Sequence, residues 1–200
     1  MIFRKKKQYT VYTYGAPVLK KPAEPVDRID GNILEIGNEM LQAMAVFEGI
    51  GLAAPQIGIS LKIMALNLPT DPDEGAELTS SLGEVLLMPL MPLVLVNPEI
   101  IFFSGAFGVR SEGCLSVPEI YAPVIRPLGI RLRGVTLGGE VIDCECGGLL
   151  GRCIQHEMDH LEGVLFVDRL TPDEFAKIEP ELKALENAGV RNEFKRKIAG

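Results

Sequence analysis

The spacing of hydrophobic residues predicts a helix near each end of the chain. Over about residues 31–48, apolar side chains recur at steps of three and four residues, the period of an amphipathic helix: Ile33, Ile36, Met40, Met44 and Phe47. Near the other end, the segment Thr171-Pro172-Asp173-Glu174 combines a capping threonine, a proline at the first helical position and a glutamate three residues after the cap. We expect a last helix to begin there.

The middle of the chain has the pattern of β-strands. Residues 61–67 and 93–103 are almost continuously apolar, and residues 130–146 predict a hairpin that turns at Gly138-Gly139. Strands crowd the middle of the sequence, helices lie toward its ends, and no internal repeat or linker interrupts them. We therefore predict one domain over residues 1–200, of the α+β class, in which a helix packs against largely antiparallel sheets.

A polar segment, residues 69–84, separates two of the predicted strands. It carries turn formers and acidic residues, which favour an excursion over the surface. The run that follows, residues 86–92, is unusually apolar. Two interpretations of it stay open, a lining for the mouth of a functional site and a contact with another subunit.

Composition and charge limit the protein classes and the cellular locations that the sequence allows. The chain is 47% hydrophobic and 24% charged, as in globular proteins, and its net charge of −7 argues against nucleic-acid coating and specific DNA binding. The apolar run at residues 85–96 is too short to cross a membrane. No apolar signal follows the basic residues 1–7, and the first 23 residues lack the Ser and Arg richness of a transit peptide. We expect a cytoplasmic protein, with organelle import less favoured, and four free or metal-bound cysteines.

The chemistry is concentrated in the segment His156-Glu157-Met158-Asp159-His160, which holds both histidines of the chain. On a helix, expected here over residues 149–162, side chains four apart lie on one face. Glu157 lies about 100° further round the helix. This is the H-E-x-x-H arrangement of metal-dependent hydrolases. The central helix of the predicted fold therefore carries a metal motif.

A catalytic metal ion typically has three protein ligands, so the third must be Cys, Asp or Glu. Cys153 would lie roughly 7 Å along the helix axis from the ion, which is too far. Cys144 and Cys146 alternate along a strand and are more simply explained as small core residues. Cys114 follows Gly113 between apolar segments. From the residues alone, a ligand and a buried structural thiol are equally good interpretations of Cys114.

Three motifs together resemble those of the peptide deformylases. They are residues 49–56 (GIGLAAPQ), 112–116 (EGCLS) and 155–161 (QHEMDHL), in the family's order, and the similarity covers most of residues 10–170. The resemblance implies a catalytic core over that range, followed by a C-terminal helix and basic tail over residues 171–200. It also implies that Cys114, His156 and His160 bind one divalent metal ion. Family members typically use Fe²⁺, and the ligand set also accepts Zn²⁺, Ni²⁺ or Co²⁺.

The resemblance also implies an activity and further site residues. The substrate would be the N-formyl-methionyl end of nascent peptides, hydrolysed to formate and a free N-terminus. Glu157 would transfer the protons, and the Gln56 side chain and the Leu115 N–H would stabilise the developing negative charge. The remaining expected contacts are glycines that let the substrate backbone approach and apolar walls for its methionine: Gly49, Gly51, Gly113, Ile50, Leu149 and Cys153.

Other features qualify the resemblance. Glu112 and Arg126 are expected to pair and stiffen the loop that carries Cys114. Residues 67–92 form a longer segment than in compact family members. Tyr121 stands where many bacterial members have a basic residue, which leaves the preference beyond the first substrate residue open.

Two rival functions use the same motif. A zinc peptidase would take a downstream third ligand, for which the chain offers Glu174, Glu179 or Glu181. A non-catalytic metal-binding module would have a closed site with four protein ligands. Loss of metal on substitution of Cys114 would separate the deformylase from the peptidase.

The last ten residues, 191–200, carry four basic residues and one acid on an otherwise acidic chain. The simpler interpretation is a solvated helix end, where cations suit the helix dipole. The alternative is a transient contact with ribosomal RNA, near the place where nascent chains emerge.

Overall fold

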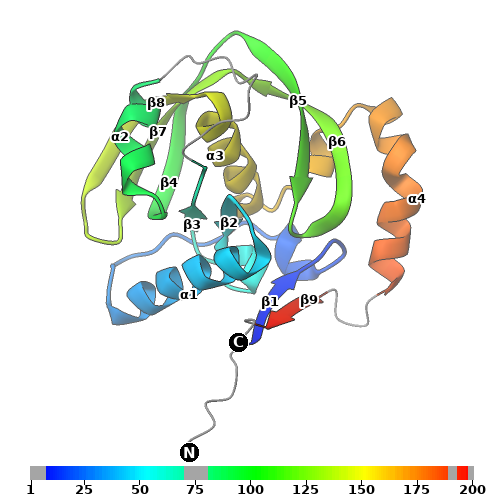
Figure 1. Cartoon of the computed structure of the whole chain (residues 1–200), viewed down its shortest axis with the longest axis horizontal. Helices are drawn as coiled ribbons and strands as arrows, with labels where there is room; N and C mark the ends of the chain where they lie inside the picture. Colours follow the sequence, from blue (N-terminus) through cyan, green and yellow to red (C-terminus); the bar gives the residue numbers. More distant parts are fainter. Residues whose placement is uncertain (1–7, 70–80, 189–192, 198–200) are drawn as a thin grey trace, which may run out of the picture.

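The computed structural model describes residues 8–69, 81–188 and 193–197, and three antiparallel sheets organise them (Figure 1). The largest has the order β2-β3-β4-β7-β8 and comprises Gly51–Ala53, Ile63–Leu66, Leu93–Phe103, Gly129–Thr136 and Val141–Gly147. The second is a hairpin of β5 (Phe107–Cys114) and β6 (Val117–Pro127), and the third pairs β1 (Gln8–Tyr12) with β9 (Glu193–Lys197). The α+β class with antiparallel sheets is confirmed.

Helix α3 (Gly148–Leu161) lies between the five-stranded sheet and the β5–β6 hairpin (Figure 1). Helix α1 (Gly31–Phe47) covers the other face of the sheet, and α4 (Pro172–Ala188) packs outside β6. The remaining elements are short: α2 (Leu82–Leu87), and the 3₁₀ turns η1 (Pro17–Lys20), η2 (Ala54–Ile57), η3 (Met88–Leu90) and η4 (Phe166–Arg169). The motif helix is thus central, as predicted.

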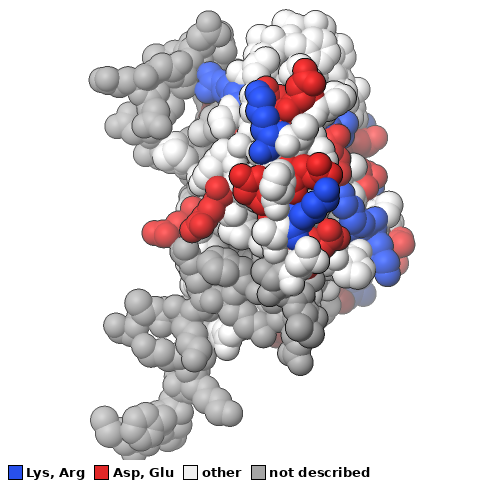
Figure 2. All heavy atoms as spheres, turned by 90° about the vertical axis from the view of Figure 1, so that its right-hand side faces the viewer, with Lys and Arg blue, Asp and Glu red and all other residues white. Residues whose placement is uncertain are grey.

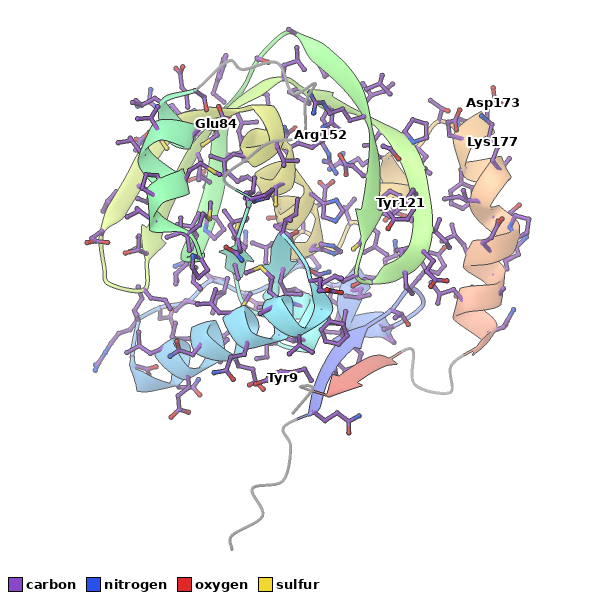
Figure 3. All side chains as sticks on the ribbon, in the orientation of Figure 1. Tyr9, Glu84, Tyr121, Arg152, Asp173 and Lys177 are labelled. Carbon is purple, nitrogen blue, oxygen red and sulfur yellow. The ribbon has the colours of Figure 1, made fainter. Side chains whose placement is uncertain are left out.

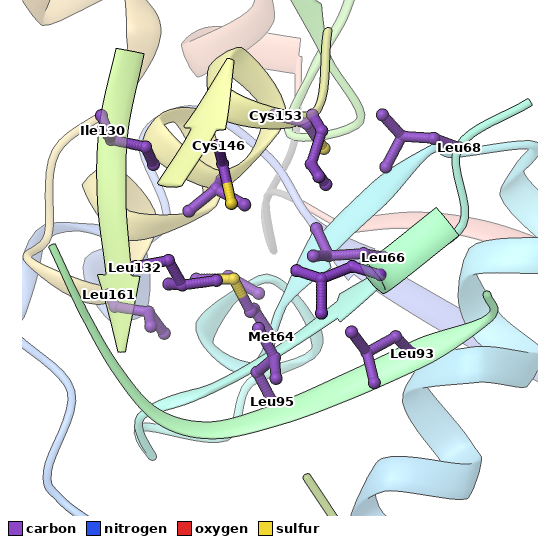
Figure 4. Close-up of a cluster of buried hydrophobic side chains, with 14 of the residues drawn as sticks. Met64, Leu66, Leu68, Leu93, Leu95, Ile130, Leu132, Cys146, Cys153 and Leu161 are labelled. Carbon is purple, nitrogen blue, oxygen red and sulfur yellow. The ribbon is translucent and has the colours of Figure 1, made fainter. Parts of the chain in front are cut away.

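The five-stranded sheet is buried on both faces at β3 and the first half of β4. In β3, Met64 and Leu66 face the core beneath α3, whereas Ile63 and Ala65 face α1. Figure 4 shows the first of these cores, in which Leu95 and other side chains of the sheet meet the side chains of α3. Burial on both faces explains why β3 and residues 93–96 of β4 are continuously apolar in sequence.

Local signals set the ends of the helices. The Asp30 carboxylate caps α1 by accepting hydrogen bonds from the backbone N–H groups of Asn32 and Ile33, at 3.0 and 3.1 Å. Helix α1 ends where Glu48 adopts a left-handed conformation, with φ of 59°. Thr171 caps α4 as predicted, since its hydroxyl accepts from the N–H of Glu174 at 3.3 Å.

Two expectations are corrected. Residues 82–84 of the predicted surface excursion begin helix α2, while residues 70–80 lie outside the described part of the chain. The basic tail is not the end of a helix, because α4 stops at Ala188 and residues 193–197 form strand β9 against β1.

Figure 2 shows acidic and basic side chains intermixed on the face seen from the side of α4. Helix α4 contributes ion pairs between Lys177 and Glu174 and between Lys183 and Glu179. Within the described residues, the helices are too short or too polar for one of them to cross a lipid bilayer.

Candidate metal centre

Cys114, His156 and His160 converge in the structure. The two histidines lie one turn apart on α3, with ring centroids 5.1 Å apart. Cys114 ends β5, and its Sγ lies 3.1 Å from His160 Nε2. One ligand atom from each residue lies within 4.8 Å of the others, and no other such His/Cys/Asp/Glu group was found in the described residues. The four-residue spacing on one helix already predicts that the two histidines are neighbours, whereas Cys114 reaches them only through the tertiary fold.

A break in the hairpin ladder presents Cys114 to the helix. Register shifts between Gly113 and Cys114, so that Cys114 pairs with Val117 across the turn. The sulfur accepts hydrogen bonds from the Ser116 N–H at 3.3 Å and from Gln56 Nε2 at 3.6 Å. These two contacts fix the position of the sulfur beside the histidines of α3.

Glu112 holds the first histidine. Its Oε2 lies 2.9 Å from His156 Nδ1, which leaves Nε2 of that ring for a metal ion. Arg126 donates to both carboxylate oxygens at 2.6 and 2.8 Å, so the predicted ion pair is present. Burial acts to raise the pKa of Glu112, but the hydrogen bonds from Arg126 and His156 outweigh it and hold that pKa well below its usual range. The carboxylate is therefore charged at neutral pH.

Glu157 is buried beside these groups. Its Oε2 has no hydrogen-bond partner within the described residues, and neither does His160 Nδ1. Burial raises the pKa of Glu157 to about 7, although His156 and Arg126 act to lower it, and a divalent cation nearby would lower it further. Burial also lowers the pKa of His160, which favours the neutral imidazole that binds metals. An unpartnered buried carboxylate oxygen and this donor set fit a metal site.

Gln56 reaches the centre from η2. Its Oε1 accepts from the Ala53 N–H at 2.7 Å, which fixes the amide so that Nε2 points to the Ser116 hydroxyl, 3.2 Å away, and to the Cys114 sulfur. Gln56 is 1% exposed. The side chain is a positioned donor rather than a loop-surface residue.

A cavity of about 460 Å³ opens at this centre. Its lining includes every predicted site residue except His160, which lies behind and is buried. The predicted lining residues are Gly49, Ile50, Gly51, Gln56, Gly113, Cys114, Leu115, Leu149, Cys153, His156 and Glu157. Tyr121, which was expected near the substrate, also lines the cavity. Sequence reasoning missed the lining residues Phe47, Glu48, Ser111, Val117, Pro118, Glu119 and Arg152.

A larger cavity of about 720 Å³ lies elsewhere, against a different face of α3 that carries Met158 and Glu162. It contains none of the three converging ligand residues. We place the candidate site in the smaller cavity, because Cys114, His156 and Glu157 line it and the buried His160 lies against Cys114.

The other thiols and the downstream glutamates stay outside the centre. Burial raises the pKa of Cys153 well above its usual value, so the thiol stays protonated. Cys144 and Cys146 are buried in the core beneath α3, as expected. In α4, Glu174 pairs with Lys177 and Glu179 with Lys183, and neither of them nor Glu181 belongs to the candidate metal-binding group of Cys114, His156 and His160.

Comparisons with known proteins agree on one family. The family model described as Polypeptide deformylase matches residues 8–176. A peptide deformylase of Synechococcus sp. (strain RCC307) is 40% identical over 163 residues, 82% of this chain and 74% of the relative. One of Prochlorococcus marinus (strain AS9601) is 41% identical over 161 residues, 80% of this chain and 73% of the relative.

Solved structures give the same result. The Arabidopsis thaliana peptide deformylase 1B, in complex with an inhibitor, superposes with a TM-score of 0.76 at 36% identity, covering 89% of this chain and 90% of that one. A peptide deformylase from Synechococcus elongatus, in complex with actinonin, has a TM-score of 0.73 at 37% identity, covering 86% and 85%. On the family match, the relatives and the fold together, the chain belongs to the polypeptide deformylase family.

Proposed function

We propose that Cys114, His156 and His160 hold one divalent metal ion. At this site, the protein removes the formyl group from N-formyl-methionyl nascent peptides. Metal-dependent deformylation is the activity of the family to which the chain belongs. The observation that carries the assignment is the convergence of one thiol and two imidazoles, with ligand atoms within 4.8 Å of one another. Three protein ligands leave a coordination position open for water, as catalytic sites require.

The chain's own groups divide the remaining work. When bound, the metal ion would act as a Lewis acid and lower the pKa of water toward neutral pH. Glu157 accepts the proton of the attacking water and returns one to the departing amine. The Gln56 amide and the Leu115 N–H donate to the formyl oxygen as it gains negative charge.

The metal ion is proposed to be Fe²⁺. A thiolate with two imidazoles also accepts Zn²⁺, Ni²⁺ or Co²⁺, so affinity alone does not choose among them. Metal analysis after anaerobic purification tests the choice. Zinc at one equivalent, with iron absent, would contradict it.

Substitution of the cysteines tests the ligand set. Cys114→Ala is expected to lose the metal ion, whereas Cys153→Ala keeps it, because Cys153 lines the cavity outside the ligand group. Metal content per chain is the measurement, with the thermal midpoint as a check of folding. A full metal equivalent in Cys114→Ala would refute the assignment.

The substrate is proposed to lie along the cavity as an extended strand. Strand β2 is the outermost strand of the five-stranded sheet, and an added strand can pair with such an edge. Gly49, Gly51 and Gly113 let the substrate backbone approach. Ile50, Leu149 and Cys153 form apolar walls for the methionine side chain.

This arrangement predicts a steep choice of substrate. Formyl-Met-Ala-Ser should exceed acetyl-Met-Ala-Ser in kcat/KM, because the donors that fix the carbonyl leave little space for a methyl group. Replacing methionine by alanine should lower kcat/KM by the equivalent of roughly 1–3 kcal/mol in activation free energy, which is the free energy gained by burying such a side chain. Comparable rates on the acetyl peptide would contradict this account of the pocket.

We also propose that the protein works in the cytoplasm and contacts the ribosome transiently through its basic tail. Formylated chains begin at the ribosome, and residues 191–200 carry four basic residues on an acidic protein. The tail is a separate feature from the cavity. Its experiment therefore leaves the metal assignment untouched.

A further inference from the structure

The metal-binding residues stand on two separate parts of the fold. Cys114 ends β5, and among the described strands β5 forms its ladder with β6 alone. The histidines stand on α3, which packs against the five-stranded sheet. Metal–ligand distances tolerate deviations of only about 0.2 Å. Whatever fastens the hairpin to α3 therefore sets the geometry of the centre.

Arg152 makes much of this connection. It lies on α3 one turn before His156, and its guanidinium reaches both strands of the hairpin. Nη1 donates to Glu112 Oε1 at 2.7 Å and to the carbonyl of Val124 at 3.1 Å, and Nη2 donates to the carbonyl of Gly108 at 2.9 Å. Figure 3 shows Arg152 in the region between α3 and β5. Although it is an arginine, it is 8% exposed.

Arg152 also completes the binding of Glu112. Oε1 of this carboxylate accepts from both Arg126 and Arg152, while Oε2 accepts from Arg126 and lies against His156 Nδ1. Arg126 belongs to β6, so its bonds to Glu112 stay within the hairpin, while its Nη1 donates to Asp159 of α3 at 2.9 Å. The bond from Arg152 crosses to the helix. Without it, Glu112 keeps one guanidinium, and β5 loses a connection two residues before Cys114.

We propose that Arg152 is a positioning residue for the metal centre. It fastens the β5–β6 hairpin to α3 and, through Glu112, fixes the orientation of His156. This inference rests on the proposed function, because it takes Cys114, His156 and His160 as the ligands. Partners that orient metal-binding histidines typically contribute 10–100-fold to metal affinity.

Two substitutions test the role of the guanidinium. Arg152→Met keeps the unbranched stem that lines the cavity but removes every donor. Arg152→Lys keeps the charge but cannot supply a planar fork to several acceptors at once. The matched control is Arg131→Met, which removes a 48% exposed side chain that pairs with Asp143 on the sheet surface.

The measurements are the Co²⁺ dissociation constant by chelator competition and the visible spectrum of the Co²⁺-loaded protein, which reports ligand geometry. Arg152→Met should bind Co²⁺ about 10–100-fold more weakly, with altered absorption bands. Arg152→Lys should be intermediate, and Arg131→Met should match the unsubstituted protein. The thermal midpoint of each metal-free protein verifies folding.

Folded Arg152→Met with affinity within twofold and an unchanged spectrum would overturn the inference. Failure of both Arg152 variants to fold would also overturn it, because the residue would then serve the fold rather than the centre. Cys114→Ala in the same titration separates failure of the ligand assignment from failure of the role proposed for Arg152. If it loses Co²⁺ while Arg152→Met binds normally, only the inference on Arg152 fails. If Cys114→Ala binds normally, the ligand assignment fails with it.

Discussion

Gly51 shows at the scale of one residue how little room surrounds Glu157. A Cβ atom at this position would lie 2.3 Å from Glu157 Oε1 and 2.8 Å from Cys153 Sγ. The nearest obstacle is thus the end of a side chain that can move, rather than the backbone. A larger residue at position 51 would therefore displace the side chain of Glu157, the proposed proton acceptor, before it destabilised the fold.

Gly51→Ala is accordingly expected to lower kcat/KM by roughly tenfold to a thousandfold while the metal content stays unchanged. Glu157→Gln, which removes the proposed proton acceptor altogether, should set the limit at about 10²–10⁴-fold. Steady-state kinetics with metal analysis is the measurement. Gly105→Ala is the control, because no atom lies within 4 Å of its added Cβ. Full activity in Gly51→Ala would show that Glu157 has more space than the structure gives it.

The sequence predicted those residues of the candidate site that lie close to one another along the chain. His156, Glu157 and His160 follow from helical spacing alone. Cys114 stayed open without the family resemblance, because its approach to His160 depends on a hairpin 46 residues away. Arg152 was missed because an arginine on a helix is ordinarily exposed, and its partners lie 28 to 44 residues distant.

At the scale of elements, the segment before β4 is attached to the end of the sheet. Ser81 caps α2 by accepting from the N–H of Glu84 at 3.3 Å, and it also accepts from the N–H of Gly147, just before α3, at 3.0 Å. Leu87 is buried in the core beneath α3. The described residues of this segment do not line the metal cavity, so its apolar run does not form the mouth of the site.

Ser81→Ala should therefore destabilise the protein without changing catalysis. Loss of a helix cap costs about 1 kcal/mol, which corresponds to a fall of roughly 2–4 °C in Tm for a protein of this size. Calorimetry and peptide kinetics on the same preparation provide the comparison. A marked fall in kcat/KM at unchanged Tm would mean that α2 acts on the site.

Prediction of strands succeeded where burial is regular. Strand β3 and residues 93–96 of β4 are apolar throughout because both faces are covered, and β7–β8 has a clear turn. Strand β5 is largely exposed, so it lacks the alternation that identifies a half-buried strand. Strand β1 finds its partner at the far end of the chain, which no local pattern can indicate.

At the scale of the whole molecule, β1 and β9 bring the two ends of the described chain together (Figure 1). Gln8 pairs with Lys197, Tyr9 with Arg196 and Thr10 with Lys195. The basic residues of β9 thus belong to a strand, with the basic run at residues 4–7 directly before β1 in the sequence.

If the tail contacts ribosomal RNA, truncation after Gly189 should abolish salt-sensitive ribosome binding while kcat/KM on a free peptide is retained. Co-sedimentation with ribosomes across a salt series is the measurement, because phosphate contacts weaken as salt rises. The double substitution Lys195→Glu and Lys197→Glu should give the same loss without removing the strand. An absence of binding at low salt in the intact protein would end the proposal.

The pairing of Gln8 with Lys197 also means that the order of elements along the chain is separable from their arrangement in space. Neighbouring ends can be joined by a short linker, and new ends can be opened at an exposed turn such as Gly138-Gly139, between β7 and β8. A circularly permuted chain of this kind would keep every residue of the metal cavity. It would also place both new termini at a turn whose residues do not line that cavity.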